Sequence, residues 1–459
     1  MLTPQTKKIA IYNLGCKVNS YEAQAMKESL EEKGYEMVDF AEVADAYLVN
    51  TCTVTNIASR KSRQMLHRAK KTNPAGLIIA IGCYVHIMEQ EGKVDPVIDV
   101  MIGNNKKQDL AEILQDLFDQ KNVKGKNPSE PLMNNRKLWD AREEATSIRR
   151  EIIDINQTKE YEKLNRSKPG GYTRQTVKVQ DGCNQFCSYC IVPMVRGRAR
   201  SRPLEEVIEE ATRLAENGCK EIVFTGIHLT SYGEDLEKVT LLNLIQEVHK
   251  VSGICRIRLG SLEPRIITEE FVESLASLEK FCPHFHLSLQ SGCDRILKEM
   301  NRHYTTEEYF DKCQLIRTHF THPSITTDII VGFPGETEEE FLTTKSFVEK
   351  INFHETHIFK FSKREGTKAA KLKGQNSSKV KNQRSEALIQ LGAKKKKEFE
   401  RYYLGKEVEV LVEGKAKVNG EELQVGYTKE YVKIAVSNER NLQNQLISVK
   451  ILEESQFVH

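Results

Sequence analysis

Gly182-Cys183-Asn184-Gln185-Phe186-Cys187-Ser188-Tyr189-Cys190 sets three cysteines in the spacing C-x3-C-x2-C. Iron–sulfur sites select thiolate ligands, and three thiolates leave one iron of a cubic cluster without a protein ligand. A structural zinc ion would instead need a fourth Cys or His nearby. The next downstream candidates, Cys219 and His228, belong to other predicted elements. The run therefore predicts a [4Fe-4S] cluster with one open iron, held by Cys183, Cys187 and Cys190. The alternative is a cysteine-rich loop without metal.

The composition is that of a folded protein with several domains. The chain has 459 residues, of which 39% are hydrophobic and 29% are charged; such a length predicts a few domains of roughly 100–200 residues. No signal pattern opens the sequence, and no apolar run approaches the roughly 18 residues of a spanning helix. Eleven cysteines without an export signal argue against a disulfide framework. We therefore expect a cytoplasmic protein that uses its cysteines for metal or thiol chemistry.

Alternating apolar runs and helical patterns predict an α/β fold class. In the first part, residues 1–145, buried strands are expected at 8–14, 46–50 and 77–81, and helices at 20–33, 58–71 and 107–120. Strands that alternate with helices form βαβ units. The sequence therefore predicts an N-terminal domain built on an open parallel sheet.

The rest of the chain is expected to contain a linker and three further parts. Residues 146–168 are polar and charged and are predicted as the linker. Residues 169–375 contain six βα units, whose strands end near residues 180, 225, 260, 290, 331 and 361, and predict an incomplete (β/α)6 barrel. Residues 376–401 predict a basic helical connector. Residues 402–459 predict short strands with turns at Gly414, Gly420 and Gly426, which is typical of a small β-barrel.

A second group of cysteines is marked by its position rather than by its spacing. Cys16, Cys52 and Cys83 each directly follow a predicted strand. Because the carboxyl ends of parallel strands meet at one edge of an open sheet, these three cysteines can converge there on a ligand. Gly15 and Gly82 allow tight turns beside them. Free cysteine is also a common core residue, so ordinary packing is the alternative interpretation.

The order of these motifs resembles the radical S-adenosylmethionine (SAM) methylthiotransferases along nearly the whole chain. The segments that carry the resemblance are Gly15-Cys16-Lys17-Val18-Asn19, Asn50-Thr51-Cys52-Thr53-Val54-Thr55, Gly82-Cys83-Tyr84, and the cysteine run with Ile191-Val192-Pro193 and Arg196-Gly197-Arg198 behind it. The resemblance implies an auxiliary [4Fe-4S] cluster on Cys16, Cys52 and Cys83, a radical-SAM barrel, and a C-terminal RNA-binding TRAM domain. In that family the open iron of the first cluster chelates SAM, and reductive cleavage of SAM releases a 5′-deoxyadenosyl radical. The auxiliary cluster holds the sulfur, which a separate SAM methylates, so cofactors rather than side chains carry the catalysis.

Within the family, the wording around Cys16 and Cys52 looks most like the MtaB type. That type adds a methylthio group to C2 of N6-threonylcarbamoyladenosine next to the anticodon of tRNA. The types that modify isopentenyladenosine in tRNA or a ribosomal protein side chain differ at those positions. The resemblance implies two [4Fe-4S] clusters, SAM, the tRNA anticodon arm and a flavodoxin- or ferredoxin-like electron donor; the sulfur source is unknown. A hypothesis of another class is a non-catalytic metal-containing RNA-binding protein.

Several residues at the ends of the predicted barrel strands are candidate SAM contacts, because barrel enzymes keep their sites at the carboxyl ends of the strands. Tyr189 matches the aromatic residue usual before the third cysteine of the family. Two arginines, Arg302 and Arg364, can neutralise a carboxylate or phosphate. The complete set of expected cofactor-binding residues is Tyr189, Gly226, Ser261, Glu263, Gln290, Asp328 and Arg364.

Basic residues gather near both cysteine groups, although the net charge is only +3. No acidic residue lies between Asp45 and Glu89, and the predicted helix after Cys52 is strongly basic. Positive patches attract phosphate through counterion release, whereas a single basic run is as often a solvated helix face. The expected RNA-binding residues are Arg60, Lys61, Arg63, Lys70, Arg196 and Arg198.

Overall fold

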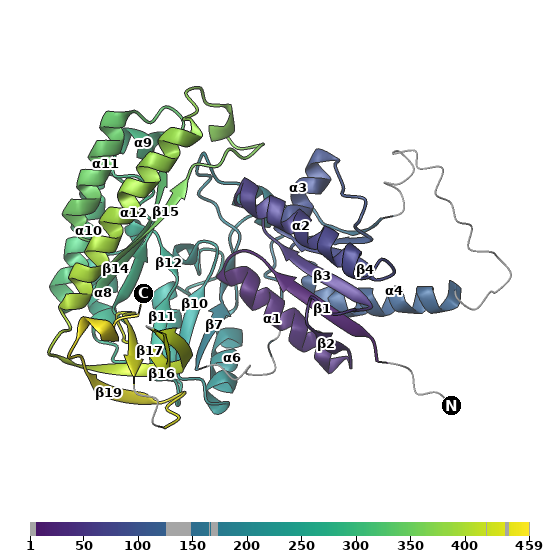
Figure 1. The fold of residues 1–459 in the computed structure, drawn as a ribbon, viewed down its shortest axis with the longest axis horizontal. Helices are drawn as coiled ribbons and strands as arrows, with labels where there is room; N and C mark the ends of the chain where they lie inside the picture. The colour runs from purple at the N-terminus through teal and green to yellow at the C-terminus, as the bar shows by residue number, and fades with distance from the viewer. Residues whose placement is uncertain are drawn as a thin grey trace. The chain divides into compact units, whose positions relative to one another are not determined.

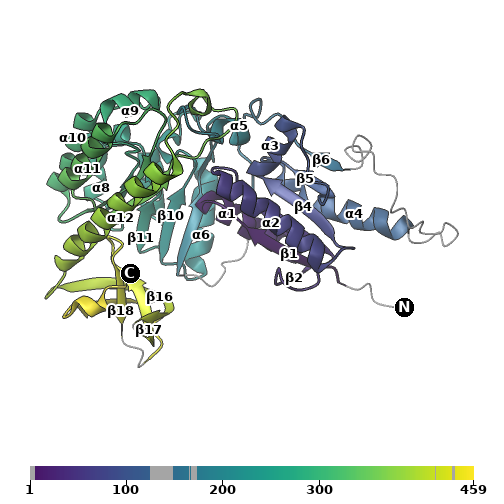
Figure 2. The ribbon, with the colours of Figure 1, turned by 45° about the horizontal axis from the view of Figure 1, so that its top comes forward.

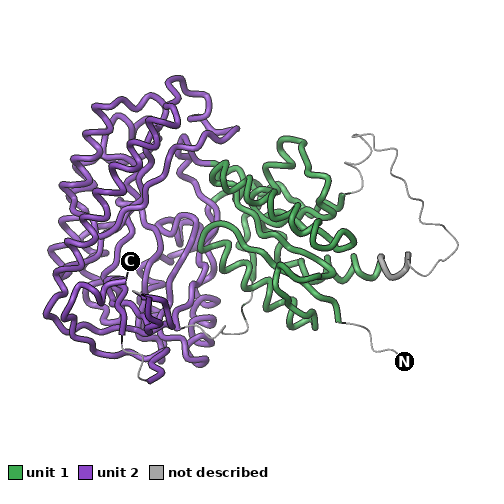
Figure 3. The backbone as a smooth tube through the Cα atoms, in the orientation of Figure 1, with its two compact units in different colours: residues 1–168, 191–198 green, residues 169–190, 199–459 purple. Residues whose placement is uncertain are grey.

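The computed structural model describes residues 6–124, 148–164, 166, 173–418, 420–436 and 440–458. The chain forms two compact units (Figure 3): unit 1 consists of residues 1–168 and 191–198, and unit 2 consists of residues 169–190 and 199–459. The eight residues that follow the last cysteine of the C-x3-C-x2-C run thus belong to unit 1. The expected boundary at residue 145 lies outside the described residues.

Unit 1 is built on a six-stranded parallel sheet in the order β2-β1-β3-β4-β5-β6 (β1 to β4 are labelled in Figure 1, β5 and β6 in Figure 2). Its strands are β1 (Lys8–Asn13), β2 (Glu36–Val38), β3 (Ala46–Thr51), β4 (Leu77–Gly82), β5 (Val100–Ile102) and β6 (Arg149–Glu151). The sequence predicted β1, β3 and β4 to within about one residue. It missed the other three because a strand of three residues is too short to show a period.

The segment expected as a linker is part of unit 1. It supplies β6, which pairs in parallel with β5. It also supplies Glu162, whose carboxylate accepts hydrogen bonds from the backbone N–H groups of Asn105 at 3.1 Å and Gln108 at 3.2 Å. This polar segment can pack against unit 1 because Glu162 accepts hydrogen bonds from backbone N–H groups between β5 and α4 that would otherwise lack a partner.

Helices cover both faces of this sheet because the strands are apolar on both sides. Ile9, Leu48 and Ile79 pack in the core beneath α1 (Lys17–Glu32) and α4 (Leu110–Lys124). Their alternate neighbours, such as Ala10 and Val49, pack beneath α2 (Asn56–Thr72) and α3 (Cys83–Glu91). The prediction of an open parallel-sheet domain is confirmed.

Unit 2 contains six long parallel barrel strands in chain order. They are β7 (Arg174–Lys178), β10 (Glu221–Thr225), β11 (Arg256–Leu259), β13 (His284–Leu287), β14 (Ser324–Val331) and β15 (Glu355–Lys360). They form the sheets β11-β10-β7 and β12-β13-β14-β15, where β12 (Ser261–Leu262) is short, and a parallel bridge from Ile257 to Phe281 connects them. Within the described residues nothing pairs β7 with β15, so the barrel is incomplete, as the sequence predicted.

The barrel strands turn one face to a shell of helices. This shell includes α6 (Leu204–Glu216), α7 (Leu241–His249), α8 (Glu269–Ala276), α10 (Thr306–His319) and α11 (Glu338–Ile351). Phe285, Leu287, Ile325 and Ile329 alternate along their strands and lie in the core that these helices cover. The residues between them therefore face the other side of the sheet.

The C-terminal part of unit 2 is a four-stranded antiparallel sheet in the order β18-β17-β16-β19. Its strands are β16 (Glu407–Val418), β17 (Glu421–Tyr427), β18 (Lys433–Val436) and β19 (Leu446–Lys450). The basic helix α12 (Ser378–Arg401) packs along β15 and leads to this sheet (Figure 1 and Figure 2). No helix in the described part of the chain combines the length and apolar character needed to cross a membrane.

Only one of the three expected glycine turns is a turn. Gly420 has φ +94° and separates β16 from β17. Gly414 instead lies at a bulge inside β16, and Gly426 lies inside β17. A Cβ at Gly426 would lie 2.3 Å from the Leu411 carbonyl oxygen, so glycine is needed there for close strand packing rather than for a turn.

Buried ion pairs fasten the C-terminal sheet to the amino ends of the barrel strands. The guanidinium of Arg258 donates to the two carboxylate oxygens of Glu221 at 2.7 and 3.3 Å. It also donates to the carbonyl oxygen of Lys429, beyond the end of β17, at 2.8 Å. Burial opposes the charge of Glu221, but Arg258 outweighs burial and holds the pKa of this carboxyl below its usual value.

A neighbouring pair of arginines strengthens the same contact. Arg256 donates to the carbonyl oxygens of Tyr427 at 2.7 Å and Glu409 at 3.0 Å. The guanidinium of Arg174 lies 5.0 Å from the ring centres of both Tyr427 and Tyr431. The C-terminal sheet is therefore a fixed part of unit 2 rather than a tethered module.

Arg258→Met should destabilise the protein strongly, because it leaves the Glu221 carboxylate buried without its main partner. We expect the free energy of unfolding to fall by about 3–5 kcal/mol, the usual cost of breaking a buried ion pair. The matched control is Lys250→Met, since the Lys250 side chain is 68% exposed in its pair with Glu247. The control should change stability by less than about 0.5 kcal/mol. Equal losses in denaturant unfolding would contradict this role of Arg258.

Candidate functional site

Three cysteines of unit 1 lie at the carboxyl edge of the parallel sheet. Cys16 follows β1, Cys52 follows β3 and Cys83 follows β4, and these strands are neighbours in the sheet. The chain leaves β1 toward β2 on one side and returns to β3 on the other, so this edge includes a topological switch point between β1 and β3. In open α/β sheets, ligands bind at such a point.

The thiols of this group influence one another. Burial raises the pKa of Cys52 to about 11, and the neighbouring thiols of Cys83 and Cys16 act in the same direction. Gly15 has φ +112°, and a Cβ on it would lie only 3.1 Å from the Cβ of Cys52. The Cys52 thiol therefore stays protonated at neutral pH unless a metal replaces its proton.

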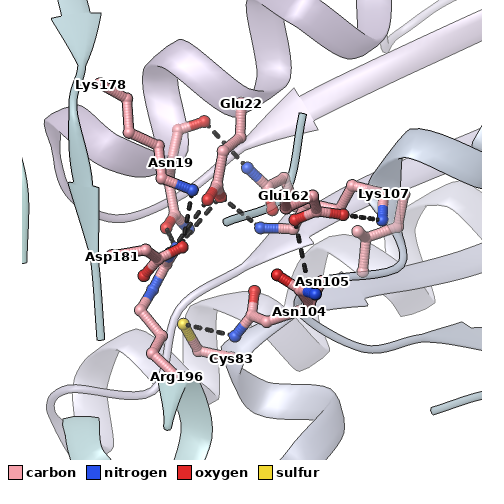
Figure 4. Close-up of polar contacts among 12 residues, drawn as sticks. Asn19, Glu22, Cys83, Asn104, Asn105, Lys107, Glu162, Lys178, Asp181 and Arg196 are labelled. Atoms are coloured by element: carbon pink, nitrogen blue, oxygen red, sulfur yellow. Dashed lines mark hydrogen bonds and ion pairs between the residues drawn. The ribbon is translucent and has the colours of Figure 1, made fainter. Parts of the chain in front are cut away.

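Two asparagines contact the sulfur atoms of this group (Figure 4). The side-chain amide of Asn104 donates to Cys83 Sγ at 3.5 Å and to the Val195 carbonyl oxygen at 2.7 Å. The Oδ1 atom of Asn19 lies 3.8 Å from Cys16 Sγ. The Nδ2 atom of Asn19 donates to the Thr51 carbonyl oxygen at 3.0 Å, which ties the Cys16 turn to the end of β3. Asn19 belongs to the segment after Cys16 that carries the family resemblance, but the contact of either asparagine with a sulfur could not be predicted, because each contact depends on the fold.

The buried carboxylate of Glu22 shares a cation, Arg196, with Asn19 (Figure 4). Arg196, at the end of α5 (Val192–Arg196), donates to Asn19 Oδ1 at 2.6 Å and to Glu22 Oε1 at 2.9 Å. Lys107 donates to the other oxygen of Glu22. The side chains of Arg196, Glu22 and Lys107 are at most 1% exposed. Arg196 is thus engaged inside unit 1, and our expectation that it contacts RNA was wrong because Glu22 requires its charge.

The cysteines of the C-x3-C-x2-C run form a compact loop in unit 2. The backbone N–H of Cys190 donates to the Cys187 carbonyl oxygen at 3.0 Å, and the N–H of Gln185 donates to Cys183 Sγ at 3.4 Å. Burial raises the pKa of Cys183 to about 11. The Cys183 thiol therefore also needs a metal to be ionised at neutral pH.

Arg302 is a partner of this loop. Its Nη1 atom donates to Cys187 Sγ at 3.4 Å, and its Nε atom donates to the Tyr304 hydroxyl at 3.0 Å. Its guanidinium also lies 4.0 Å from the carboxylate of Glu263. Burial opposes the charge of Glu263, but His228, Arg265 and Arg302 outweigh burial and lower its pKa to about 2. A cation placed in this way stabilises a thiolate.

The other expected SAM contacts lie near the ends of barrel strands with different degrees of constraint. Gly226 follows β10, and a Cβ there would lie 2.8 Å from the Gln180 side chain. Gln290 has φ +69° and is only 8% exposed. Asp328 lies within β14, three residues before its end. The remaining members differ in burial, with Ser261 exposed, Tyr189 half-buried, and Arg364 and Glu263 buried. Their contacts with SAM stay a prediction.

The basic helix after Cys52 is α2, and its charged side chains face solvent. Its buried residues Ser59, Ser62, Leu66 and Ala69 recur at helical spacing against the sheet. Thr55 caps the helix by accepting a hydrogen bond from the Ala58 N–H at 3.1 Å. The exposed face carries Arg60, Lys61 and Arg63, with Lys70 partly buried, and Arg198 is exposed in the segment after α5.

A group of side chains with the spacing of a single-ion site lies on the barrel strands of unit 2. In a tetrahedral zinc site the sulfurs are about 3.8 Å apart, since each Zn–S bond is about 2.3 Å. In the described residues, the one group of three metal-binding side chains with ligand atoms all within 4.8 Å of one another is His286, Asp328 and His357.

Known proteins match the chain in both units. Residues 177–348 match the family described as Radical SAM superfamily, and residues 8–103 match Uncharacterized protein family UPF0004. A Bacillus subtilis protein named threonylcarbamoyladenosine tRNA methylthiotransferase MtaB is 38% identical over 98% of this chain and 96% of its own length. The chain belongs to the radical-SAM methylthiotransferase family. An Alkaliphilus oremlandii relative, named tRNA-2-methylthio-N(6)-dimethylallyladenosine synthase, is 33% identical over 98% of this chain and 91% of its own.

A solved structure supports the fold of this methylthiotransferase. The radical SAM methyltransferase TsrM from Kitasatospora setae aligns with a TM-score of 0.53 and 17% identity, covering 78% of this chain and 75% of TsrM. As a member of its family, the methylthiotransferase binds [4Fe-4S] clusters and SAM. The two cysteine groups fit such clusters because each presents three soft sulfur donors. Each group also contains one buried thiol, Cys52 or Cys183, whose pKa is raised to about 11 and which therefore needs a metal to ionise at neutral pH.

Arg196→Met should weaken iron binding by the unit 1 cysteines. The substitution releases Asn19 and leaves Glu22 with Lys107 as its remaining cation, so we expect a loss of stability of about 3 kcal/mol, at the low end for a broken buried pair. The test is iron bound per chain after anaerobic reconstitution, in a background with Cys183, Cys187 and Cys190 replaced by Ala. Arg198→Met is the matched control, because Arg198 is exposed two residues further on. Unchanged iron binding in the Arg196 variant would contradict its supporting role.

Proposed function

We propose that this methylthiotransferase adds a methylthio group to C2 of N6-threonylcarbamoyladenosine next to the anticodon of tRNA. In this proposal one SAM is the methyl donor and another is the radical source. The substrate assignment is supported by relatives named for threonylcarbamoyladenosine tRNA in Bacillus subtilis, at 38% identity, and in Aquifex aeolicus, at 37% identity. It is also supported by the sequences around Cys16 and Cys52.

The observation that carries the proposed reaction is the second cysteine group at the switch point of the unit 1 sheet. A radical-SAM cluster alone can account for hydrogen abstraction but not for delivery of sulfur. Cys16, Cys52 and Cys83 supply three thiolates to an additional cluster and leave one of its irons free for sulfur. This arrangement distinguishes a methylthiotransferase from a radical enzyme with one cluster.

The side chains hold, orient and shield the cofactors. When bound, the clusters and SAM supply a methylated sulfur and a carbon radical, which an unactivated aromatic C–H bond requires. Cys183, Cys187 and Cys190 hold one cluster, and Arg302 donates to the Cys187 thiolate. On the auxiliary cluster, Asn104 donates to the Cys83 thiolate. Hydrogen bonds to the sulfurs and burial tune the reduction potential of such clusters.

The proposed path of tRNA follows positive charge. The exposed face of α2 carries Arg60, Lys61 and Arg63, and Lys394–Lys397 lie in α12 ahead of the C-terminal sheet. We assign residues 402–459 to a TRAM-like RNA-binding domain and residues 169–375 to the radical-SAM domain. A flavodoxin- or ferredoxin-like protein is the proposed electron donor.

Mass spectrometry of tRNA nucleosides from a deletion strain tests the substrate. Loss of the methylthio form of threonylcarbamoyladenosine, restored by the wild-type gene, is the expected result. The second candidate substrate is dimethylallyladenosine, which several relatives at 33–34% identity carry in their names. Loss of its methylthio form, or of a methylthio group on a ribosomal protein, would overturn the assignment.

Cys187→Ala and Cys52→Ala should separate the two proposed clusters. Two remaining thiolates cannot hold the cluster that chelates SAM, so Cys187→Ala should abolish deoxyadenosine formation under reductant. Cys52→Ala should keep reductive SAM cleavage but yield no methylthiolated RNA, because only the sulfur-carrying cluster is lost. Cys255→Ala is the control, since Cys255 belongs to neither group. Methylthiolated product from the Cys52 variant would remove Cys52 from the site.

Replacement of Arg60, Lys61, Arg63 and Lys70 by Gln should weaken tRNA binding without changing SAM cleavage. Glutamine has nearly the same helix propensity, so α2 should persist. Each lost phosphate contact should flatten the slope of log affinity against log salt by roughly 0.9, the value for duplex DNA. The matched control replaces Lys298, Lys312, Lys345 and Lys350 on barrel helices by Gln. If the slope of log tRNA affinity against log salt were the same in both variants, α2 would not bind RNA and its basic side chains would only be solvated.

A further inference from the structure

The inner face of the barrel strands β13, β14 and β15 carries an unusual group of polar side chains. His286, Asp328 and His357 lie on these three neighbouring strands, and Asp328 is directly opposite His357 in the register. The alternate residues Phe285, Leu287 and Ile329 pack in the core under the barrel helices. The three polar side chains therefore point away from that core, into the side of the sheet that the helices leave open.

The three side chains form what we call the imidazole cluster. Their ligand atoms all lie within 4.8 Å of one another. His286 Nε2 is 3.4 Å from Asp328 Oδ2, and the rings of His286 and His357 stack with centres 5.7 Å apart. Thr326 holds His286 from the other side, with 3.0 Å between Oγ1 and Nδ1. His286 is thus fixed, whereas His357 is exposed and can meet a ligand.

An exposed aromatic side chain lies on the same face, nearer the carboxyl edge. Phe359 follows His357 by two residues on β15 and is 48% exposed. Its register partner is Ile330 of β14, which packs in one cluster with Tyr189 of the cysteine loop. The face that carries the imidazole cluster therefore continues to the radical-SAM loop within unit 2.

We propose that the imidazole cluster binds the polar N6 substituent of the target adenosine while Phe359 stacks on its base. This inference rests on the proposed function and names the residues that select its substrate. The threonylcarbamoyl group carries a carboxylate, a hydroxyl and urea N–H groups. The imidazole N–H of His357 can donate to the carboxylate of that group. In this proposal Asp328 contacts the substrate in place of the SAM contact expected from the sequence, and its carboxylate can accept from the hydroxyl or the urea. Stacking on Phe359 places the base closer to the carboxyl edge than its substituent.

The same cluster disfavours an apolar substituent. A dimethylallyl group offers no hydrogen bond, so its burial on this face would cover the His357 imidazole and the Asp328 carboxylate without replacing the hydrogen bonds that they make to water. Sites that hydrogen-bond a substrate group discriminate strongly against analogues that lack it, whereas apolar pockets discriminate weakly. The cluster therefore accounts for selectivity between the two tRNA nucleosides that the relatives of this chain are named for.

The test compares anticodon stem-loop RNAs that carry threonylcarbamoyladenosine or dimethylallyladenosine. His357→Phe keeps an aromatic side chain at an exposed position and removes its hydrogen bonds. We expect its kcat/KM for the threonylcarbamoyl RNA to fall about 10- to 100-fold, the usual effect of losing a hydrogen bond to a charged group. The dimethylallyl RNA should not lose rate, and uncoupled SAM cleavage should stay at the wild-type level. His357→Gln, which retains an N–H donor, should recover part of the loss.

Two further variants separate selectivity from general effects. His319→Phe makes the same exchange on the outer helix α10 and should change neither rate. Phe359→Leu should lower kcat/KM for both RNAs by a similar factor, because stacking does not depend on the N6 substituent. The ratio of kcat/KM for the threonylcarbamoyl RNA to kcat/KM for the dimethylallyl RNA should therefore stay at the wild-type value.

The outcomes distinguish this inference from the proposed function. If the wild-type enzyme acts on the dimethylallyl RNA alone, both the proposed function and this inference are wrong. If it acts on the threonylcarbamoyl RNA but His357→Phe keeps the wild-type ratio, only the imidazole cluster is wrong. A non-iron divalent metal bound at one per chain in the wild type and lost in His357→Phe would also overturn the inference, because these side chains would then be metal ligands.

Discussion

The parallel direction of the strands is the constraint on which the rest of this protein depends. In unit 1, β1, β3 and β4 all end at one edge, and a cysteine follows each of them. In unit 2 the barrel strands are also parallel, so the expected SAM contacts from Gly226 to Asp328 lie at or near their carboxyl ends. An antiparallel sheet would send alternate strand ends to opposite edges and scatter both groups. Chemistry that needs ligands from distant parts of the chain thus follows from the strand direction.

Buried carboxylates determine how each unit is completed. Glu22 is buried in unit 1, where Arg196 and Lys107 compensate its charge and Arg196 also contacts Asn19 beside Cys16. Glu221 lies at the opposite, amino end of the barrel strands, where Arg258 pairs with it and binds the turn beyond β17. A charge inside a protein needs such partners because its desolvation is costly. The first network links the Cys16 turn to the segment after the radical-SAM cysteines, and the second fixes the C-terminal sheet to the barrel.

Much of the fold was predictable because its signals are local. The strand β3 is recognisable in the sequence as a continuous buried run of six residues, and α2 is recognisable by buried residues three or four apart. The strands β2, β5 and β6 were missed because each has three residues. The prediction of turns at Gly414 and Gly426 was wrong because a glycine can also allow a bulge or close packing within a strand. Arg196 was assigned to RNA because it lies in a basic run of the sequence. Its ion-pair partner Glu22 is 174 residues away, so the sequence did not reveal that the arginine is buried.

The sequence by itself determined the chemistry of the protein. The spacing of Cys183, Cys187 and Cys190 predicts a cluster, since short loops limit which thiolates can share one metal site. The convergence of Cys16, Cys52 and Cys83 needed the sheet order, which brings strand ends together from across some 70 residues. The tertiary structure alone decided the partners of the sulfurs, Asn19, Asn104 and Arg302, and the grouping of His286, Asp328 and His357. Such contacts join side chains from separate strands and helices, and no local pattern in a sequence records which of these will pack together.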